Sequence, residues 1–165
     1  MGDISLRILG LDPGVAKTGY AFIENEICLS WGVIKTDKNK SLNERIFSIV
    51  KKIEKLLNEK KPQFCVIETF FFKPTAAKSI IFSLHLRGAI FYLLTKKKIP
   101  LIEVTPAKVK LAICGNGRAA KKQIKYMIKK IFNLENKLNE HSADALAVAY
   151  TGYKEIQIRH YLKND

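Results

Sequence analysis

Runs of hydrophobic residues, broken by short polar turns, dominate the first 36 residues of the chain. Residues 6–11, 18–23 and 27–36 have patterns typical of β-strands. Asp12-Pro13-Gly14 separates the first two runs, and residues 24–26 separate the next two; both favour tight turns. Because connections this short join antiparallel neighbours, we expect the chain to open with an antiparallel meander.

An amphipathic helix is predicted next. Apolar residues recur with i, i+3 and i+4 spacing from Leu42 to Leu57. Ser41 and Glu44 have the spacing of a capping box at its start. This segment should therefore cover one face of the sheet.

Strand and helix patterns alternate after Pro62. The continuous apolar run at 64–67 suits a central strand covered on both faces, and a short strand is predicted at 101–104. A meander followed by this alternation predicts an α/β fold with a mixed five-stranded sheet, flanked by helices. We find no repeat or flexible linker, so we expect one domain over residues 1–165. Helices are predicted at 75–96, 106–113, 119–132 and 140–152.

Composition indicates a folded, basic protein. The 165 residues include 29 Lys and Arg against 15 Asp and Glu, a net charge of +14, and 47% are hydrophobic. We find neither a secretory signal nor the ~18 uninterrupted apolar residues of a membrane span. The three cysteines are odd in number and widely spaced, which favours reduced thiols over disulfides or a zinc site. We therefore expect a cytoplasmic protein that does not bind membranes.

The positive charge is concentrated in one segment. Residues 96–130 contain eleven basic residues and one acidic residue, Glu103. Such a field attracts polyanions, so nucleic acid is the expected partner. A solvated lysine-rich surface is the alternative explanation from charge alone.

Two carboxylates occupy positions that are costly without a compensating charge. Asp12 and Glu68 each end an apolar strand, where an ionised group costs several kcal/mol unless it is paired. His141 and Asp144 are three residues apart on a predicted helix and share one face. Small residues at 145–149 let this helix approach the sheet closely, so we expect the four side chains to converge.

A cluster rich in carboxylates and without a cysteine pair suits magnesium or manganese better than structural zinc. Two such ions can clamp an in-line phosphoryl displacement, so a basic surface beside this cluster indicates a nuclease. Taken singly, each residue also has an ordinary structural explanation. Asp12 can stabilise a turn, Glu68 can pair with a lysine, and Asp144 can contact the start of its helix.

Several short motifs occur in a distinctive order. They are LGLDPG at 9–14, TGY at 18–20, VIE at 66–68, GNGRAAK at 115–121 and HSADALA at 141–147. Together they resemble the motifs of RuvC-type Holliday junction resolvases over about residues 8–151, nearly the whole chain. The resemblance implies an RNase H-like fold, a homodimer, and magnesium-dependent symmetrical nicking of four-way DNA junctions in recombination and repair. It also implies the RuvA junction-binding and RuvB motor proteins as companions.

By position, the resemblance assigns a catalytic metal site with two ions, Mg²⁺ or Mn²⁺, to Asp12, Glu68, His141 and Asp144. It assigns Lys110 and Lys121 to the surroundings of the scissile phosphate. The residue pattern supports Lys121, which leans toward the apolar side of its predicted helix while Lys122, Lys125 and Lys129 point away.

Three consecutive phenylalanines, Phe70 to Phe72, follow Glu68 closely. Alternate strand residues face opposite sides, so at least one ring needs a second buried face or is exposed. An exposed ring beside the metal site can stack on unpaired bases at the crossover. We expect Phe70 to pack in the core. The residues predicted to contact DNA are Phe71, Phe72, Lys73, Lys78, Arg118 and Lys122.

Some positions depart from the family pattern. His141 stands where many members carry aspartate, and an imidazole favours manganese. Leu84-His85-Leu86 replaces a more usual Gly-Gln pair in the segment that resembles the dimer helix. Two alternatives remain open: an RNA-processing nuclease of the same fold, and a junction-binding protein without activity. An actin-like ATP-binding domain is excluded, because it needs about twice this length.

Overall fold

A mixed five-stranded sheet crosses the molecule in the computed structural model, which describes residues 5–70, 77–134 and 138–164. The sheet order is β3-β2-β1-β4-β5. The first three strands pair antiparallel, and β4 and β5 continue the sheet parallel to β1, which confirms the predicted arrangement. The strands are β1 (Arg7–Asp12), β2 (Lys17–Glu24), β3 (Ile27–Lys35), β4 (Phe64–Glu68) and β5 (Leu101–Val104).

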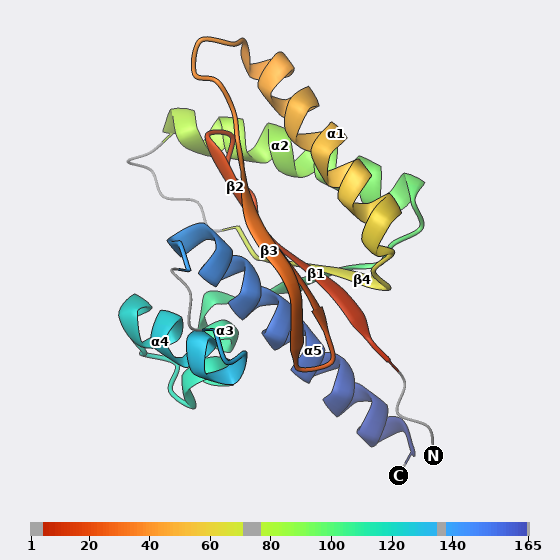
Figure 1. Cartoon of the computed structure of the whole chain (residues 1–165), viewed down its shortest axis with the longest axis vertical. Helices are drawn as coiled ribbons and strands as arrows, with labels where there is room; N and C mark the ends of the chain where they lie inside the picture. Colours follow the sequence, from red (N-terminus) through yellow and green to blue (C-terminus); the bar gives the residue numbers. More distant parts are fainter. Residues whose placement is uncertain (1–4, 71–76, 135–137, 165) are drawn as a thin grey trace.

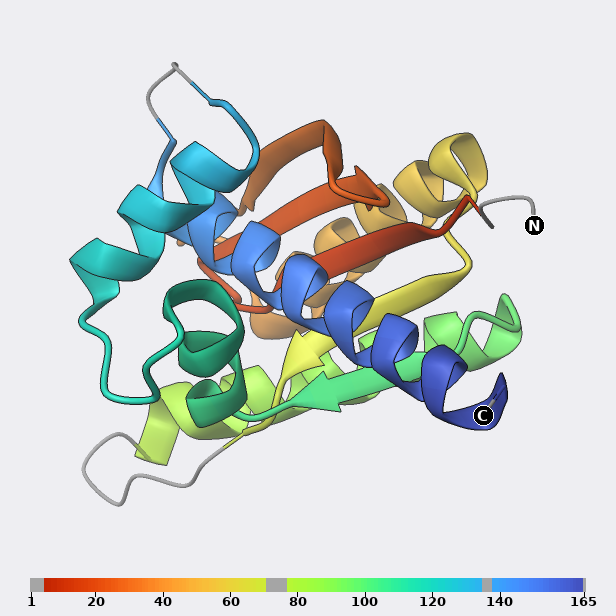
Figure 2. The same cartoon turned by 90° about the horizontal axis from the view of Figure 1, so that it is seen from below.

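Helices cover both faces of this sheet (Figure 1). Alternate strand residues separate the two cores: Leu9, Leu11 and Cys65 pack toward α1 and α2, whereas Ile8 and Val66 pack toward α5. Figure 2 shows α5 lying across the strands on the second face. The helices are α1 (Leu42–Lys60), α2 (Ala77–Lys96), α3 (Pro106–Cys114), α4 (Lys121–Ile131) and α5 (Glu140–Asn164). No helix in the described ranges is long and apolar enough to cross a membrane.

The amphipathic helix α1 forms as its sequence predicts. The Glu44 carboxylate accepts a hydrogen bond from the Ser41 backbone N–H at 2.9 Å, as in a capping box. Ile49, Ile53 and Leu57 are buried against the sheet. Lys61 ends the helix in the left-handed conformation, with φ of 47°, directly before Pro62.

The C-terminal helix corrects one prediction. We expected it to end at Gly152, but α5 continues to Asn164. A side chain at Gly152 would place its Cβ 2.4 Å from Val66 Cγ2, so this glycine allows close packing against β4 and does not terminate the helix. Beyond Gly152, Glu155 Oε1 lies 2.8 Å from Lys108 Nζ, and this ion pair joins the extension to α3.

Two glycines bring the start of α5 onto the sheet. A Cβ at Gly10 would lie 2.1 Å from the Ala145 carbonyl oxygen, and one at Gly19 would lie 2.1 Å from the His141 carbonyl oxygen. Only glycine fits such close approaches. The first turns of α5, which carry His141 and Asp144, therefore lie directly against β1 and β2.

Candidate active site

A cavity of about 810 Å³ opens where β1 and β4 end. These strands are parallel neighbours, with Leu11 opposite Ile67, so the carboxylates that follow them emerge at the same edge. The start of α5 contributes a third carboxylate, and α2, α3 and α4 with the loop before it contribute basic side chains. The charged residues that line the cavity are Asp12, Glu68, Arg87, Lys110, Arg118, Lys121 and Asp144.

Two of the three carboxylates have close partners. Asp144 Oδ2 lies 3.2 Å from Lys121 Nζ, and the same ammonium lies 3.7 Å from Glu140. Asp12 Oδ2 lies 2.8 Å from His141 Nδ1. The predicted inward orientation of Lys121 therefore corresponds to a contact with Asp144. His141 itself lines a neighbouring hollow and reaches the cavity through Asp12.

The charged side chains of the cavity shift one another's pKa values. Burial raises the pKa of Glu68 above its ordinary value, and the nearby charges of Asp144 and Asp12 raise it further. Burial also raises the pKa of Asp144, although the ammonium of Lys121 offsets part of that effect. For Lys121, partial burial lowers the pKa but Asp144 and Glu140 more than compensate, so it is raised overall.

The donor set suits a hard divalent cation. The three carboxylates come from separate elements and disfavour one another's ionised forms, a conflict that a cation between them relieves. Oxygen-rich ligands match magnesium or manganese. Among the described residues, no three Asp, Glu, His or Cys side chains converge closely enough to hold one ion as they stand. For three of these side chains to hold one ion, they would have to rotate toward one another.

Arg87 anchors the end of β4 beside the cavity, a role that the sequence analysis missed. Its Nη1 donates to the Glu68 backbone oxygen at 3.0 Å, and its Nη2 donates to Glu103 Oε1 at 2.6 Å. The side chain is only 8% exposed, and its Cζ lies 6.0 Å from the centre of the Phe70 ring and 5.6 Å from that of Phe91. The available signal was Glu103, the one acid in the basic segment.

The predicted DNA-contacting residues have different outcomes. Arg118 lines the cavity, whereas Lys122 is exposed on α4 and does not line it. Phe70 is half-buried and lines the cavity, so our expectation of core packing was wrong for this residue. Phe71, Phe72 and Lys73 lie outside the described residues, as does the side chain of Lys78.

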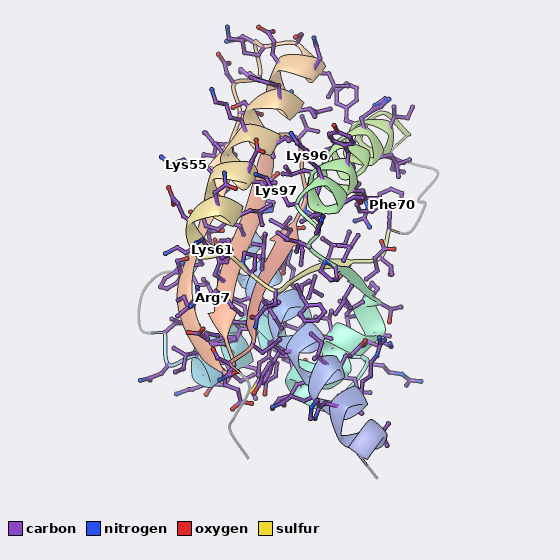
Figure 3. The ribbon with its side chains drawn as sticks, turned by 90° about the vertical axis from the view of Figure 1, so that its right-hand side faces the viewer. Arg7, Lys55, Lys61, Phe70, Lys96 and Lys97 are labelled. Carbon is purple, nitrogen blue, oxygen red and sulfur yellow. The ribbon has the colours of Figure 1, made fainter. Side chains whose placement is uncertain are left out.

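The basic segment at 96–130 does not form one surface. Lys96 and Lys97 lie at the end of α2, close to the end of α1 and apart from Phe70 (Figure 3). Lys110 and Lys121 line the cavity instead. The chain passes through β5 between these two groups, so they occupy opposite ends of the sheet.

Acidic residues at the ends of β1 and β4 and on a C-terminal helix, beside basic side chains, define a class of protein. With this sheet order, they define an RNase H-like nuclease. Comparison with known families then specifies which one. The chain belongs to the RuvC family: the family described as "Crossover junction endodeoxyribonuclease RuvC" matches residues 8–152. Nucleases of this family are metal-dependent endonucleases that resolve Holliday junctions.

Individual relatives agree with this assignment. A RuvC from Prochlorococcus marinus (strain MIT 9312) is 40% identical over 159 residues, covering 91% of this chain and 98% of that protein. One from Syntrophomonas wolfei is 33% identical over 165 residues, covering 97% and 95%. The solved structure of Thermus thermophilus RuvC in complex with a Holliday junction substrate matches with a TM-score of 0.82 and 25% identity, covering 93% of this chain and 96% of that one.

Proposed function

We propose that this chain resolves four-way DNA junctions by hydrolysing phosphodiester bonds in the cavity at the ends of β1 and β4. The observation that carries the proposal is the meeting of three carboxylates, Asp12, Glu68 and Asp144, with basic side chains in one cavity. Carboxylates can hold the metal, and the adjacent cations can hold a phosphate.

Asp12, Glu68, Asp144 and His141 are the proposed ligands of two divalent ions, magnesium or manganese. When bound, such ions supply activation of the attacking water and stabilisation of the leaving oxygen. His141 positions the Asp12 carboxylate through their 2.8 Å contact. Lys110, Lys121 and Arg118 add positive charge where the phosphate gains negative charge during the reaction.

Lys122 and Lys78 are also proposed to contact the DNA backbone, and Phe71, Phe72 and Lys73 to contact the crossover. We also propose a cytoplasmic location, as the sequence analysis predicts. RuvA and RuvB remain predicted companions, as the family resemblance implies.

We further propose that the working unit is a homodimer formed through α2. Ile81, Leu84 and Tyr92 are 51%, 47% and 71% exposed and recur along one side of this helix. Gly88 lies on the same side, and nothing approaches the position of a Cβ there within 4 Å. A symmetric dimer presents two equivalent cavities, which accounts for cutting two opposed strands.

Cleavage of a mobile four-way DNA junction tests the function. Purified protein is incubated with junction in Mg²⁺, Mn²⁺ or EDTA, beside Asp12→Asn and the matched control Glu59→Gln, which lies on α1. We expect paired, ligatable nicks that need metal, persist in the control and vanish in Asp12→Asn. Tight junction binding without cutting in any metal would support a binding protein. Preferential cutting of structured RNA would support an RNA-processing nuclease.

A further inference from the structure

Two further hollows continue from the catalytic cavity along the surface. The first, of about 480 Å³, shares Phe70 and Ser83 with the cavity and includes His141 in its lining. The second, of about 710 Å³, shares Arg45 with the first. Each hollow has wall residues in common with the next, so the two hollows lie side by side between the catalytic cavity and the start of α1, and we call them together the α1 groove.

Positive charge follows this groove. Lys17 and Arg45 line the first hollow, and its described lining contains no acidic residue. Lys35 and Lys40 line the second hollow with Arg45. Of the two acids there, the Asp37 carboxylate accepts a hydrogen bond from the Asn39 N–H at 2.9 Å, and Glu44 caps α1 and lies 4.0 Å from Lys40. The groove is therefore basic throughout, and most strongly so beside the catalytic cavity.

Arg45 is held where the two hollows meet. Its Nε donates to Thr36 Oγ1 at 2.9 Å, and the Thr36 hydroxyl donates to the Val15 carbonyl oxygen at 2.6 Å. This chain of contacts joins α1, the end of β3 and the turn between β1 and β2. In the described part of the protein, the Nη atoms of Arg45 make no hydrogen bond or ion pair. A guanidinium fork held in place in this way matches the geometry of a phosphate.

An aromatic ring completes the far end of the groove. Phe47 lines the second hollow and is 68% exposed. Exposed rings interleaved with basic side chains are typical of surfaces that contact nucleic-acid strands, where the ring packs on a sugar or base. An acidic protein segment would gain little from this ring beside the guanidinium.

We propose that the α1 groove is a second DNA contact surface, which holds the strand that leads away from the scissile phosphate. Arg45 binds a backbone phosphate, Lys17 and Lys35 neutralise its neighbours, and Phe47 packs on a sugar or an unpaired base. The inference rests on the proposed function, because it requires DNA in the catalytic cavity. It adds the path of that DNA across β2, β3 and α1.

Salt-dependent junction binding tests the proposal. Each substitution is made in the cleavage-deficient Asp12→Asn background, and the Kd for a four-way junction is measured between about 50 and 200 mM salt. Arg45→Gln and Lys17→Gln should each lower the slope of log Kd against log salt by about 1. Lys55→Gln is the matched control, since Lys55 lies on α1 apart from Phe70 (Figure 3) and should leave the slope unchanged.

Two further measurements separate DNA contact from a structural role. Thr36→Val removes the hydroxyl that accepts the hydrogen bond from Arg45 Nε, but it removes no charge. The slope of log Kd against log salt should therefore match the wild-type slope within error. With Asp12 restored, Arg45→Gln and Lys17→Gln should each raise the protein concentration needed for half-maximal junction cleavage, whereas Lys55→Gln should leave it unchanged. Unchanged slopes in both variants, or an equal loss in Thr36→Val, would overturn the α1 groove. Failure of the proposed function would instead appear as no cleavage by the wild-type protein.

Discussion

At the scale of single residues, the carboxylates of the cavity differ in how their charge is balanced. Asp144 has the ammonium of Lys121 at 3.2 Å and Asp12 has the imidazole of His141 at 2.8 Å. Glu68 has no side-chain partner this close among the described residues, and its pKa is raised by burial and by the other two carboxylates. The ionised Glu68 therefore opposes folding at neutral pH, and under the proposed function the same charge attracts the metal.

Replacing Glu68 should separate stability from activity. Because the pKa of the folded state is raised, ionisation costs stability above that pKa, and the cost disappears as pH falls below the ordinary value of 4.5. We expect Glu68→Gln to raise the Tm in EDTA at pH 7 by about 1–3 °C, an advantage that shrinks toward pH 4. Junction cleavage should fall at least about 100-fold, because the bound metal lowers the activation free energy of hydrolysis by several kcal/mol. A lower Tm at pH 7 would contradict this account.

His141 tests whether the imidazole has a specific role. Substitution His141→Asp replaces the ring beside Asp12 by a carboxylate, which repels Asp12 until a cation lies between them. We expect a lower Tm in EDTA, recovery of that Tm in Mg²⁺, and cleavage in Mg²⁺ within about tenfold of wild type. Complete loss of cleavage with normal Mg²⁺ stabilisation would mean that the imidazole does something a carboxylate cannot do.

At the scale of elements, Arg87 connects three of them at the cavity. It extends from α2 to the backbone of Glu68 in β4 and to the side chain of Glu103 in β5. The Arg87 side chain is buried beside two aromatic rings, which restricts the orientation of its guanidinium. The same helix carries the proposed dimer surface on its outer side, so Arg87 links that helix to the strand that ends at the proposed metal site.

We expect Arg87→Gln to act through the position of Glu68. Cleavage at saturating junction should fall about 10- to 100-fold, as for other residues that orient metal ligands, while junction Kd stays within about twofold. Loss of the two hydrogen bonds should destabilise the fold by about 1–3 kcal/mol. Arg87→Lys should restore part of the rate, and Glu103→Gln added to Arg87→Gln should restore stability only. Recovery of cleavage together with stability in that double variant would reduce Arg87 to a structural residue.

At the scale of the whole molecule, the proposed dimer surface is an apolar stripe on the outer side of α2. Leu84 is 47% exposed in the middle of the stripe, beside Gly88. In a symmetric dimer, a charged side chain placed in this stripe would face its own copy in the partner subunit. Burying these two like charges would weaken the free energy of dimerisation.

Leu84→Glu should therefore raise the dimer dissociation constant at least about 100-fold, measured by sedimentation equilibrium. Nicks on the two opposed strands should become uncoupled, because each chain would then cut independently. Leu111→Glu on α3, at a position 58% exposed, is the matched control and should leave both properties unchanged. An unchanged sedimentation profile for Leu84→Glu would move the dimer interface elsewhere.

Much of this protein was determined by its sequence alone. Hydrophobic periodicity predicted the strands, their antiparallel opening and α1 with its capping box, because these patterns reflect contacts between residues near one another in the chain. The spacing of His141 and Asp144 on one helix and the acids after apolar strands predicted their meeting, and the cavity contains three of the four side chains. The end of α5 was missed, since a glycine that packs against Val66 looks like a stop signal.

The tertiary structure alone decided which charges meet. The contacts of His141 with Asp12, of Lys121 with Asp144 and of Arg87 with the end of β4 join elements far apart in sequence. The basic segment divides between opposite ends of the sheet because β5 separates its two parts, and the α1 groove gathers Lys17, Lys35 and Arg45 from three elements. Local patterns fix which way each side chain leaves its own strand or helix. The distances between those elements, which set electrostatic energies, exist only after the chain has folded.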